Sequence, residues 1–151
     1  MNNQKISEVK VTYKNKVKAS ERPKICDSKA SYNILRNAFD PDIIELKESC
    51  KVLLLNQANK VLGVMCVSEG GITGTIVDVK LILQAAILSN ASGIILCHNH
   101  PSGNLTVSAQ DDFITSRLKK ACEIMDISLL DHLIIVPEEN LYYSYADEGR
   151  I

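Results

Sequence analysis

Two histidines lie two residues apart at the end of an apolar run. The run is IILC, residues 94–97, and it is followed by His98, Asn99 and His100. Because side chains alternate along a strand, we expect both imidazoles to project from one face and Asn99 from the other. Imidazole nitrogens are common zinc ligands, so a pair held side by side on a rigid strand supplies two ligands of a zinc site.

A carboxylate follows at a spacing that suits a third ligand. Residues 101–107 form a turn, Ser108 is expected to cap a helix, and Asp111 then lies in the first helical turn. Two imidazoles and one carboxylate leave a fourth position for water, as in hydrolytic zinc sites. Ser108 and Asp111 also fit a simple capping box, so these two residues alone would not indicate a metal.

The elements around this pattern alternate between strands and helices. Strands are predicted at residues 6–13, 49–56, 60–67, 94–99, 127–136 and 141–145. Helices are predicted after caps at Asp27–Ser28, Asp78 and Ser108, and they run to about Phe39, Asn90 and Met125. The second helix is apolar nearly all round, so we expect it to be buried. The pattern predicts an α/β domain with a mixed β-sheet flanked by helices.

The pattern as a whole resembles the motif of a known metalloprotease family. His98, His100, Ser108 and Asp111 match the JAMM (MPN-type) motif, and HNHPSGN with LLDHLII further along resembles the RadC family. The likeness covers about residues 40–150. It implies a JAMM/MPN architecture related to cytidine deaminases, with one zinc ion per chain held by the two histidines and Asp111. It also implies hydrolysis of a peptide or isopeptide bond in a peptide or protein substrate.

The resemblance further implies a catalytic glutamate ahead of an early strand. Glu48 begins ESCKVLLLN, which resembles the family pattern E-x-F-x-V-L-x-L-N, with Cys50 in place of the aromatic residue. Glu45 and Glu69 are alternatives. We expect Glu48 to act as general base and then as general acid, and the Ser108 hydroxyl to donate to the developing oxyanion.

Two further polar residues are candidates for supporting the metal ligands. Asn99 lies between the two histidines, and His132 lies in the apolar run at 127–136, beside Asp131. Alternation makes Asp131 and His132 point to opposite faces, so they do not form a simple pair. His132 is expected to be hydrogen bonded in the core or to orient a metal ligand from outside the coordination shell.

Charge separates residues 1–24 from the rest of the chain. Seven basic and two acidic residues give this arm a charge of +5, whereas the whole chain carries −1. A basic arm is typical of an edge strand guarded by lysines, or of a segment that contacts DNA phosphates. The alternative functions are therefore a RadC-type DNA repair or recombination factor and a non-catalytic interaction module that keeps a metal.

The composition is that of an ordinary globular domain, and 151 residues suffice for one domain covering 1–151. No apolar run approaches the roughly 20 residues that cross a bilayer, and the polar start lacks a signal peptide, so we expect a cytoplasmic protein without membrane contact. Five scattered cysteines, several of them inside apolar runs, indicate buried free thiols in a reducing compartment. A nucleobase deaminase is excluded because its H-x-E and P-C-x-x-C signatures are replaced by HNH and PSGN.

Overall fold

The computed structural model describes residues 7–10, 12–70 and 76–151. Its described residues form a sheet of five strands in the order β2-β1-β3-β4-β5. The strands are β1 (Ser49–Leu55), β2 (Val61–Glu69), β3 (Gly93–Asn99), β4 (Ser128–Ile135) and β5 (Tyr142–Ser144). β3 and β4 are parallel and the other neighbouring strands are antiparallel, so the predicted mixed α/β sheet is confirmed.

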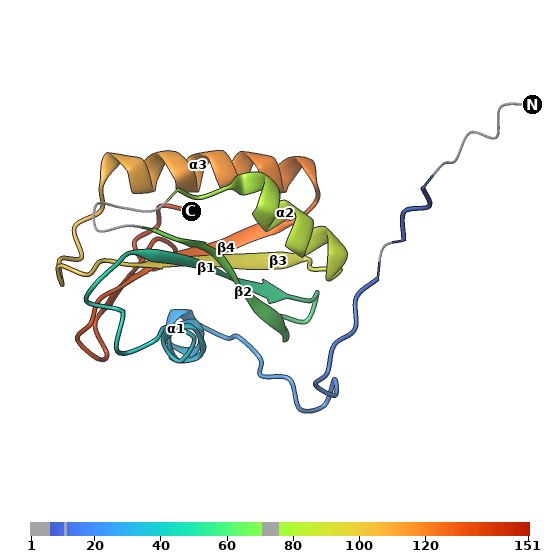
Figure 1. Ribbon diagram of the computed structural model, residues 1–151, viewed down its shortest axis with the longest axis horizontal. Coiled ribbons are helices and arrows are strands. Elements are labelled where there is room, and N and C mark those ends of the chain that lie inside the picture. Colours follow the sequence, from blue (N-terminus) through green and yellow to red (C-terminus); the bar gives the residue numbers. More distant parts are fainter. Residues whose placement is uncertain (1–6, 11, 71–75) are drawn as a thin grey trace, which may run out of the picture.

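Helices cover both faces of this sheet (Figure 1). α2 (Val79–Leu88) and α3 (Ala109–Ile124) lie on one face, and α1 (Ser28–Arg36) lies on the other. Each helix begins at its predicted cap, because a side-chain oxygen of Asp27, Asp78 or Ser108 accepts a backbone N–H of the first turn.

The sheet separates two apolar cores, which explains why β3 is apolar along its whole length. Ile94 and Leu96 pack with α2 and α3, whereas Ile95 and Cys97 pack with α1. The same alternation continues to the end of the strand. His98 therefore faces the α3 side and Asn99 the α1 side, as the spacing predicted.

Two predictions about the elements were wrong. Within the strand predicted at 6–13, residues 7–10 and 12–13 form no strand, and residues 6 and 11 lie outside the described part. The segment leads away from the body of the molecule, so its apolar side chains are not buried, and Val9 is 86% exposed (Figure 1). Tyr13, and Asn15 just beyond the segment, attach it to β2 by donating from their side chains to the Leu62 carbonyl at 2.9 and 3.0 Å.

The burial predicted for α2 was also only half right. Val79, Ile82 and Ala86 are buried, but Ile87 and Leu88 are 47% and 44% exposed. The helix lies in an outer layer, so one face contacts the sheet and α3 while the other faces outward (Figure 1). All-round apolar character does not reveal that a helix has neighbours on one side only.

The five cysteines are free thiols, as predicted, but the predicted burial holds only for Cys50, Cys97 and Cys122, because Cys26 and Cys66 are exposed. Burial raises the pKa of the Cys122 thiol to about 11, so this side chain behaves as a small apolar group of the core. None of the described helices combines the length and the apolar content needed to cross a bilayer.

Candidate metal centre

The end of β3 and the start of α3 are brought together by a tight turn. The His100 N–H donates to the Ile135 carbonyl at 2.8 Å, which keeps the chain beside β4 for one residue beyond β3. Pro101 cannot continue a ladder, and Gly103 adopts a φ of 78°, a conformation that favours glycine. The first turn of α3 therefore lies over the two histidines.

The three predicted ligands converge at this place. His98 Nε2 lies 3.0 Å from Asp111 Oδ1 and 2.9 Å from His100 Nε2, and His100 Nε2 lies 3.6 Å from Asp111 Oδ2. The ligand atoms all lie within 4.8 Å of one another. His98 and Asp111 are buried, and the His100 side chain, 16% exposed, is the most open of the three.

The tautomer of His100 follows from a backbone contact. His100 Nδ1 lies 2.7 Å from the Asn104 carbonyl oxygen. A carbonyl can only accept, so Nδ1 carries the hydrogen, and in the neutral ring Nε2 presents its lone pair to the cluster.

A chain of buried hydrogen bonds assigns the tautomer of His98 in the same way. The Thr115 hydroxyl donates to the Asp111 carbonyl at 2.6 Å, so its oxygen must accept from His132 Nδ1, also at 2.6 Å. His132 Nε2 is then an acceptor, and His98 Nδ1 donates to it at 2.8 Å. In the neutral form of the ring, His98 Nε2 is left with a lone pair directed at the cluster. His132 thus orients a predicted ligand and does not itself join the cluster.

Burial supports this arrangement of protons. Burial lowers the pKa of His132, and the neighbouring His98 lowers it further, so the ring is held neutral. A neutral His132 has one donor and one acceptor nitrogen, and these bond to Thr115 and His98 respectively.

Asp111 is both a member of the cluster and part of the helix cap. The capping box is complete, because Asp111 Oδ2 accepts the Ser108 N–H at 2.8 Å and Ser108 Oγ accepts the Asp111 N–H at 3.1 Å. The Ser108 hydroxyl also donates to Oδ2 at 2.7 Å. The capping alternative therefore holds alongside convergence with the histidines, and it fixes the carboxylate in place.

The charges of the cluster are coupled. A hydrogen bond to Asp111 raises the pKa of His100 against the opposing effect of burial. Burial raises the pKa of Asp111, but hydrogen bonds from His100 and His98 outweigh it and hold the pKa well below its usual range. Asp111 is therefore ionised at neutral pH, the form that binds a metal.

Glu48 lines the same cavity as His98 and Asp111, a space of about 170 Å³ beside the cluster. Glu48 is distant from the histidines in sequence. The pairing of β1 with β3, which puts Cys50 opposite His98, brings it close in space. Of the two alternatives, Glu69 is paired with Lys47 at 3.0 Å, and the Glu45 side chain is exposed. Of these three glutamates, only Glu48 lines the cavity beside His98 and Asp111.

Asn99 holds the segment that carries Glu48. Its Oδ1 accepts the Ser49 N–H at 2.7 Å, and its Nδ2 donates to the Lys47 and Ile44 carbonyls at 3.0 and 2.8 Å. The backbone on both sides of Glu48 is thereby bonded to a residue whose own chain neighbours are His98 and His100. Asn99 thus connects the two faces of β3.

Sequence reasoning missed Thr115 as a member of this network. Thr115 lies four residues after Asp111 on α3, a spacing at which a threonine hydroxyl reaches the earlier carbonyl. The hydrogen bond to the Asp111 carbonyl could therefore have been predicted from the sequence. The contact with His132 depends on the packing of α3 against β4.

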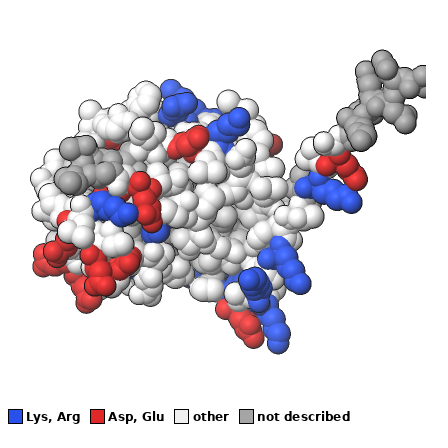
Figure 2. All heavy atoms as spheres, viewed as in Figure 1, with Lys and Arg blue, Asp and Glu red and all other residues white. Residues whose placement is uncertain are grey.

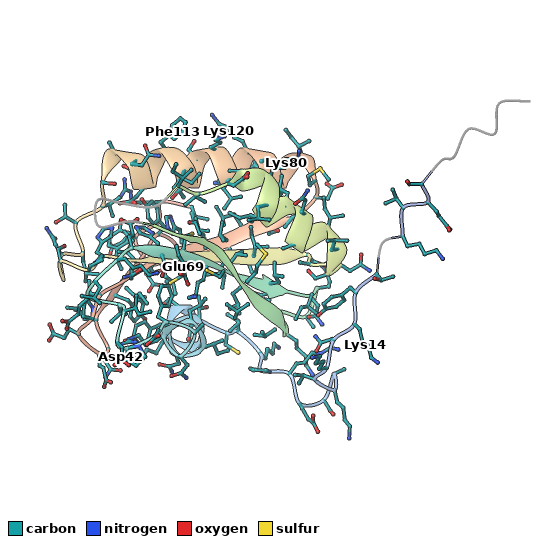
Figure 3. The ribbon with its side chains drawn as sticks, in the orientation of Figure 1. Lys14, Asp42, Glu69, Lys80, Phe113 and Lys120 are labelled. Carbon is teal, nitrogen blue, oxygen red and sulfur yellow. The ribbon has the colours of Figure 1, made fainter. Side chains whose placement is uncertain are left out.

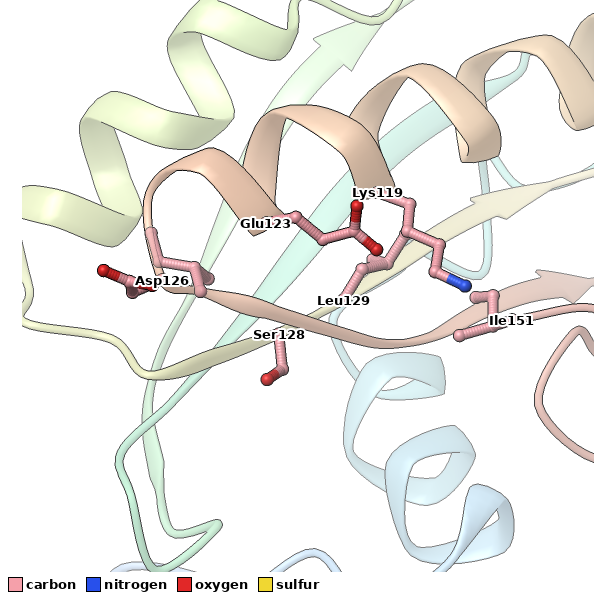
Figure 4. A pocket seen from close by; sticks show the side chains of 7 residues that line it. Lys119, Glu123, Asp126, Ser128, Leu129 and Ile151 are labelled. Atoms are coloured by element: carbon pink, nitrogen blue, oxygen red, sulfur yellow. The ribbon is translucent and has the colours of Figure 1, made fainter.

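A larger hollow lies at the other end of α3 (Figure 4). It measures about 530 Å³, and its lining includes Lys119 and Glu123 of α3, Asp126 beyond the helix, and Ile151. The described metal-ligand cluster does not extend to it.

Comparison with known proteins places the chain in context. The model of the family described as "RadC-like JAB domain" matches residues 25–150. The UPF0758 protein of Flavobacterium johnsoniae is 49% identical over 127 residues, which are 83% of this chain and 53% of that protein. The UPF0758 protein of Porphyromonas gingivalis is 41% identical over 131 residues, 86% of this chain and 56% of its own length. The chain thus spans about half the length of these relatives.

Proposed function

The chain belongs to the family of RadC-like JAB domains, and from its site we propose that it is a zinc-dependent hydrolase of peptide or isopeptide bonds. One observation carries the proposal. Two imidazole Nε2 atoms and a carboxylate converge within 4.8 Å, and a glutamate lines the adjoining cavity.

The donor set fits a divalent cation. The hydrogen bonds of the neutral rings leave lone pairs on Nε2 of both His98 and His100, and these atoms lie 2.9 Å apart. Two lone pairs this close repel unless a cation lies at the cluster. Imidazole ligands favour zinc over magnesium or calcium, which prefer oxygen. His98, His100 and Asp111 would hold the ion.

When bound, zinc supplies a Lewis acid and lowers the pKa of water towards ~7. Glu48 accepts the proton of the attacking water and returns it to the leaving amine. The Ser108 hydroxyl, after rotating away from Asp111, donates to the developing oxyanion. Asn99 keeps the Glu48 segment beside the histidines.

Metal content and cleavage test this proposal separately. We expect about one zinc per wild-type chain by elemental analysis, and its loss in His100→Ala. Glu48→Gln should keep the zinc and lose about 10²–10⁴-fold in cleavage of a peptide mixture, read by mass spectrometry. Glu45→Gln, a change of the same kind three residues earlier, is the matched control and should cleave normally.

Two outcomes would overturn it. A wild-type chain that takes up no metal when zinc is supplied has no such site. A wild-type chain that binds zinc but cleaves no peptide is a non-catalytic interaction module, and cleavage that is equally fast in Glu48→Gln removes the proposed role of Glu48.

DNA association is a second candidate, supported by the basic N-terminal arm. Figure 2 shows basic side chains gathered on the segment that leads away from the body. If the arm contacts phosphates, affinity for a DNA duplex should fall steeply with salt, and Lys14→Gln/Lys16→Gln/Lys18→Gln should flatten this dependence. Lys119→Gln/Lys120→Gln is the control on α3. No binding to a duplex at low salt excludes this function.

A further inference from the structure

The cavity beside His98 and Asp111 is also lined by residues that have no part in the proposed chemistry. One helix face supplies much of its wall, since residues at i, i+3, i+4 and i+7 lie on one side of a helix. These α3 residues are Gln110, Phe113, Ile114 and Arg117, and Ile76 and Val77 line it from before α2. The cavity therefore combines a catalytic side with an apolar and cationic side.

Large apolar side chains at this wall are unusually open. Phe113 is 58% exposed and Ile76 is 87% exposed. In Figure 3, Phe113 stands on the outer side of α3. Single exposed apolar residues need no explanation, but two that line one small cavity next to a reactive centre offer an apolar contact to a ligand.

Among the described residues that line this cavity, Arg117 is the one lysine or arginine. The other three arginines donate to protein oxygens: Arg22 to the Val17 carbonyl, Arg36 to the Pro137 carbonyl and Arg150 to Asp112. Arg117 makes no hydrogen bond or ion pair with any other described residue. A guanidinium without a partner among the described residues is suited to a carboxylate, which it can bind through two parallel hydrogen bonds.

The size of the cavity limits what it can hold. At about 170 Å³ it lies below the range of roughly 300–1,000 Å³ typical of sites that enclose a whole small molecule. It has room for one side chain of a longer ligand, while the remainder of that ligand stays outside.

We propose that this cavity is a substrate subsite that takes one apolar side chain beside the scissile bond, while Arg117 binds a carboxylate of the same peptide. The inference rests on the proposed function in treating the ligand as a substrate. The carboxylate is either an acidic side chain or the free C-terminus. Both present the same planar group to a guanidinium.

Binding to an inactive chain tests the subsite without requiring turnover. Zinc-loaded Glu48→Gln protein is immobilised and exposed to a pooled heptapeptide library. The library has Leu or Ser at the centre, Gly, Ser, Gln or Glu elsewhere, and either a free or an amidated C-terminus. The bound fraction is sequenced by mass spectrometry. We expect Leu over Ser, and about tenfold enrichment of peptides with a carboxylate over their Gln or amide counterparts.

Second substitutions in the same background identify the groups responsible. Arg117→Gln should abolish the carboxylate enrichment and Arg117→Lys should keep part of it, whereas Lys120→Gln, further along α3 (Figure 3), should leave it intact. Phe113→Ala should reduce the preference for Leu. Ile124→Ala is its control, because Ile124 is 82% exposed on the same helix and does not line the cavity.

The two arms of the library distinguish the source of the carboxylate. Enrichment of Glu in amidated peptides indicates an acidic side chain, and enrichment of free acids without Glu indicates the C-terminus. Equal binding of carboxylate and neutral peptides, or an enrichment that survives in Arg117→Gln, overturns the proposal.

Cleavage by the wild-type chain is read in parallel, so the two proposals fail separately. Selective binding without cleavage would remove the hydrolase and retain the peptide site. Cleavage without the Arg117-dependent preference would remove the subsite alone.

Discussion

The two ends of α3 border hollows of very different size and chemistry. The end that begins at Ser108 lies over a cavity of about 170 Å³, and the end near Ile124 borders one of about 530 Å³. At the first end, buried hydrogen bonds orient Asp111 and the histidines. At the second, the side chains of Lys119 and Glu123 make no ion pair or hydrogen bond with other described residues.

The difference shows that a site is marked by convergence and not by volume. A helix N-terminus favours carboxylates, and α3 has Asp111 and Asp112 in its first turn. The tertiary fold adds two imidazoles and a glutamate to that end. At the other end, the charged side chains of Lys119 and Glu123 make no ion pair or hydrogen bond with described residues, so they form no common centre.

The largest expected effect is at Asp111. Asp111→Asn keeps the size of the side chain but removes the anion, so we expect zinc affinity to fall by more than about 100-fold, beyond the range seen for residues that only support a ligand. Competitive titration with a zinc chelator measures it. Asp126→Asn, the same change at the other end of α3, should leave the zinc affinity unaltered. An equal loss of affinity in both variants would contradict the assignment of Asp111 as a zinc ligand.

A smaller loss is expected at His132, which touches a ligand without joining the cluster. The ring of His132 stacks on Tyr145 with centroids 4.9 Å apart. His132→Phe retains a ring there but cannot accept from His98, so zinc affinity should fall by about 10–100-fold. The same titration measures it, with urea unfolding to verify the fold. Unchanged affinity would mean that the chain of hydrogen bonds does not orient His98.

The metal-free chain should show a pH-dependent contribution from the cluster. The pKa of His100 is raised by its hydrogen bond to Asp111, so this stabilisation is fully present below the unfolded value of about 6.5 and is lost as pH rises through the folded pKa. The pKa of Asp111 is lowered, so its contribution is present above about 3.9 and is lost on acidification through the folded pKa.

Urea unfolding with a chelator present isolates the His100 part. Near pH 6, the free energy of unfolding of the wild type should exceed that of His100→Gln by about 1–3 kcal/mol, as for a hydrogen bond to a charged group. This difference should shrink towards pH 8 or above. A difference that stays constant over this range would contradict the assigned coupling. Asp126→Asn should show no comparable change.

The smallest effect is expected in the larger hollow. Glu123→Gln removes an exposed charge with no described partner, so the free energy of unfolding should change by no more than about 0.5 kcal/mol. Zinc content and peptide cleavage should stay at wild-type values. A clear loss of cleavage would show that the larger hollow contributes to function and would weaken the comparison.

Much of the fold and of the candidate site could be predicted because it depends on short-range patterns. Alternation places His98 and His100 on one face, and caps at Asp78 and Ser108 start two helices where expected. The basic arm shows the limit of such patterns, since alternating residues near Val9 suggested a strand. A strand also needs a neighbouring strand and a surface on which to bury its apolar side chains, and Val9 remains 86% exposed.

The sequence by itself determined the residue types and local spacings from which a site for one metal ion could form. Only the tertiary structure decided which distant groups join it. The pairing of β1 with β3 brings Glu48 to the cavity, and the packing of α3 on β4 joins Thr115 to His132. The physical reason is range: helix caps and strand faces follow from neighbouring residues, whereas strand order and register arise from burial of the whole core.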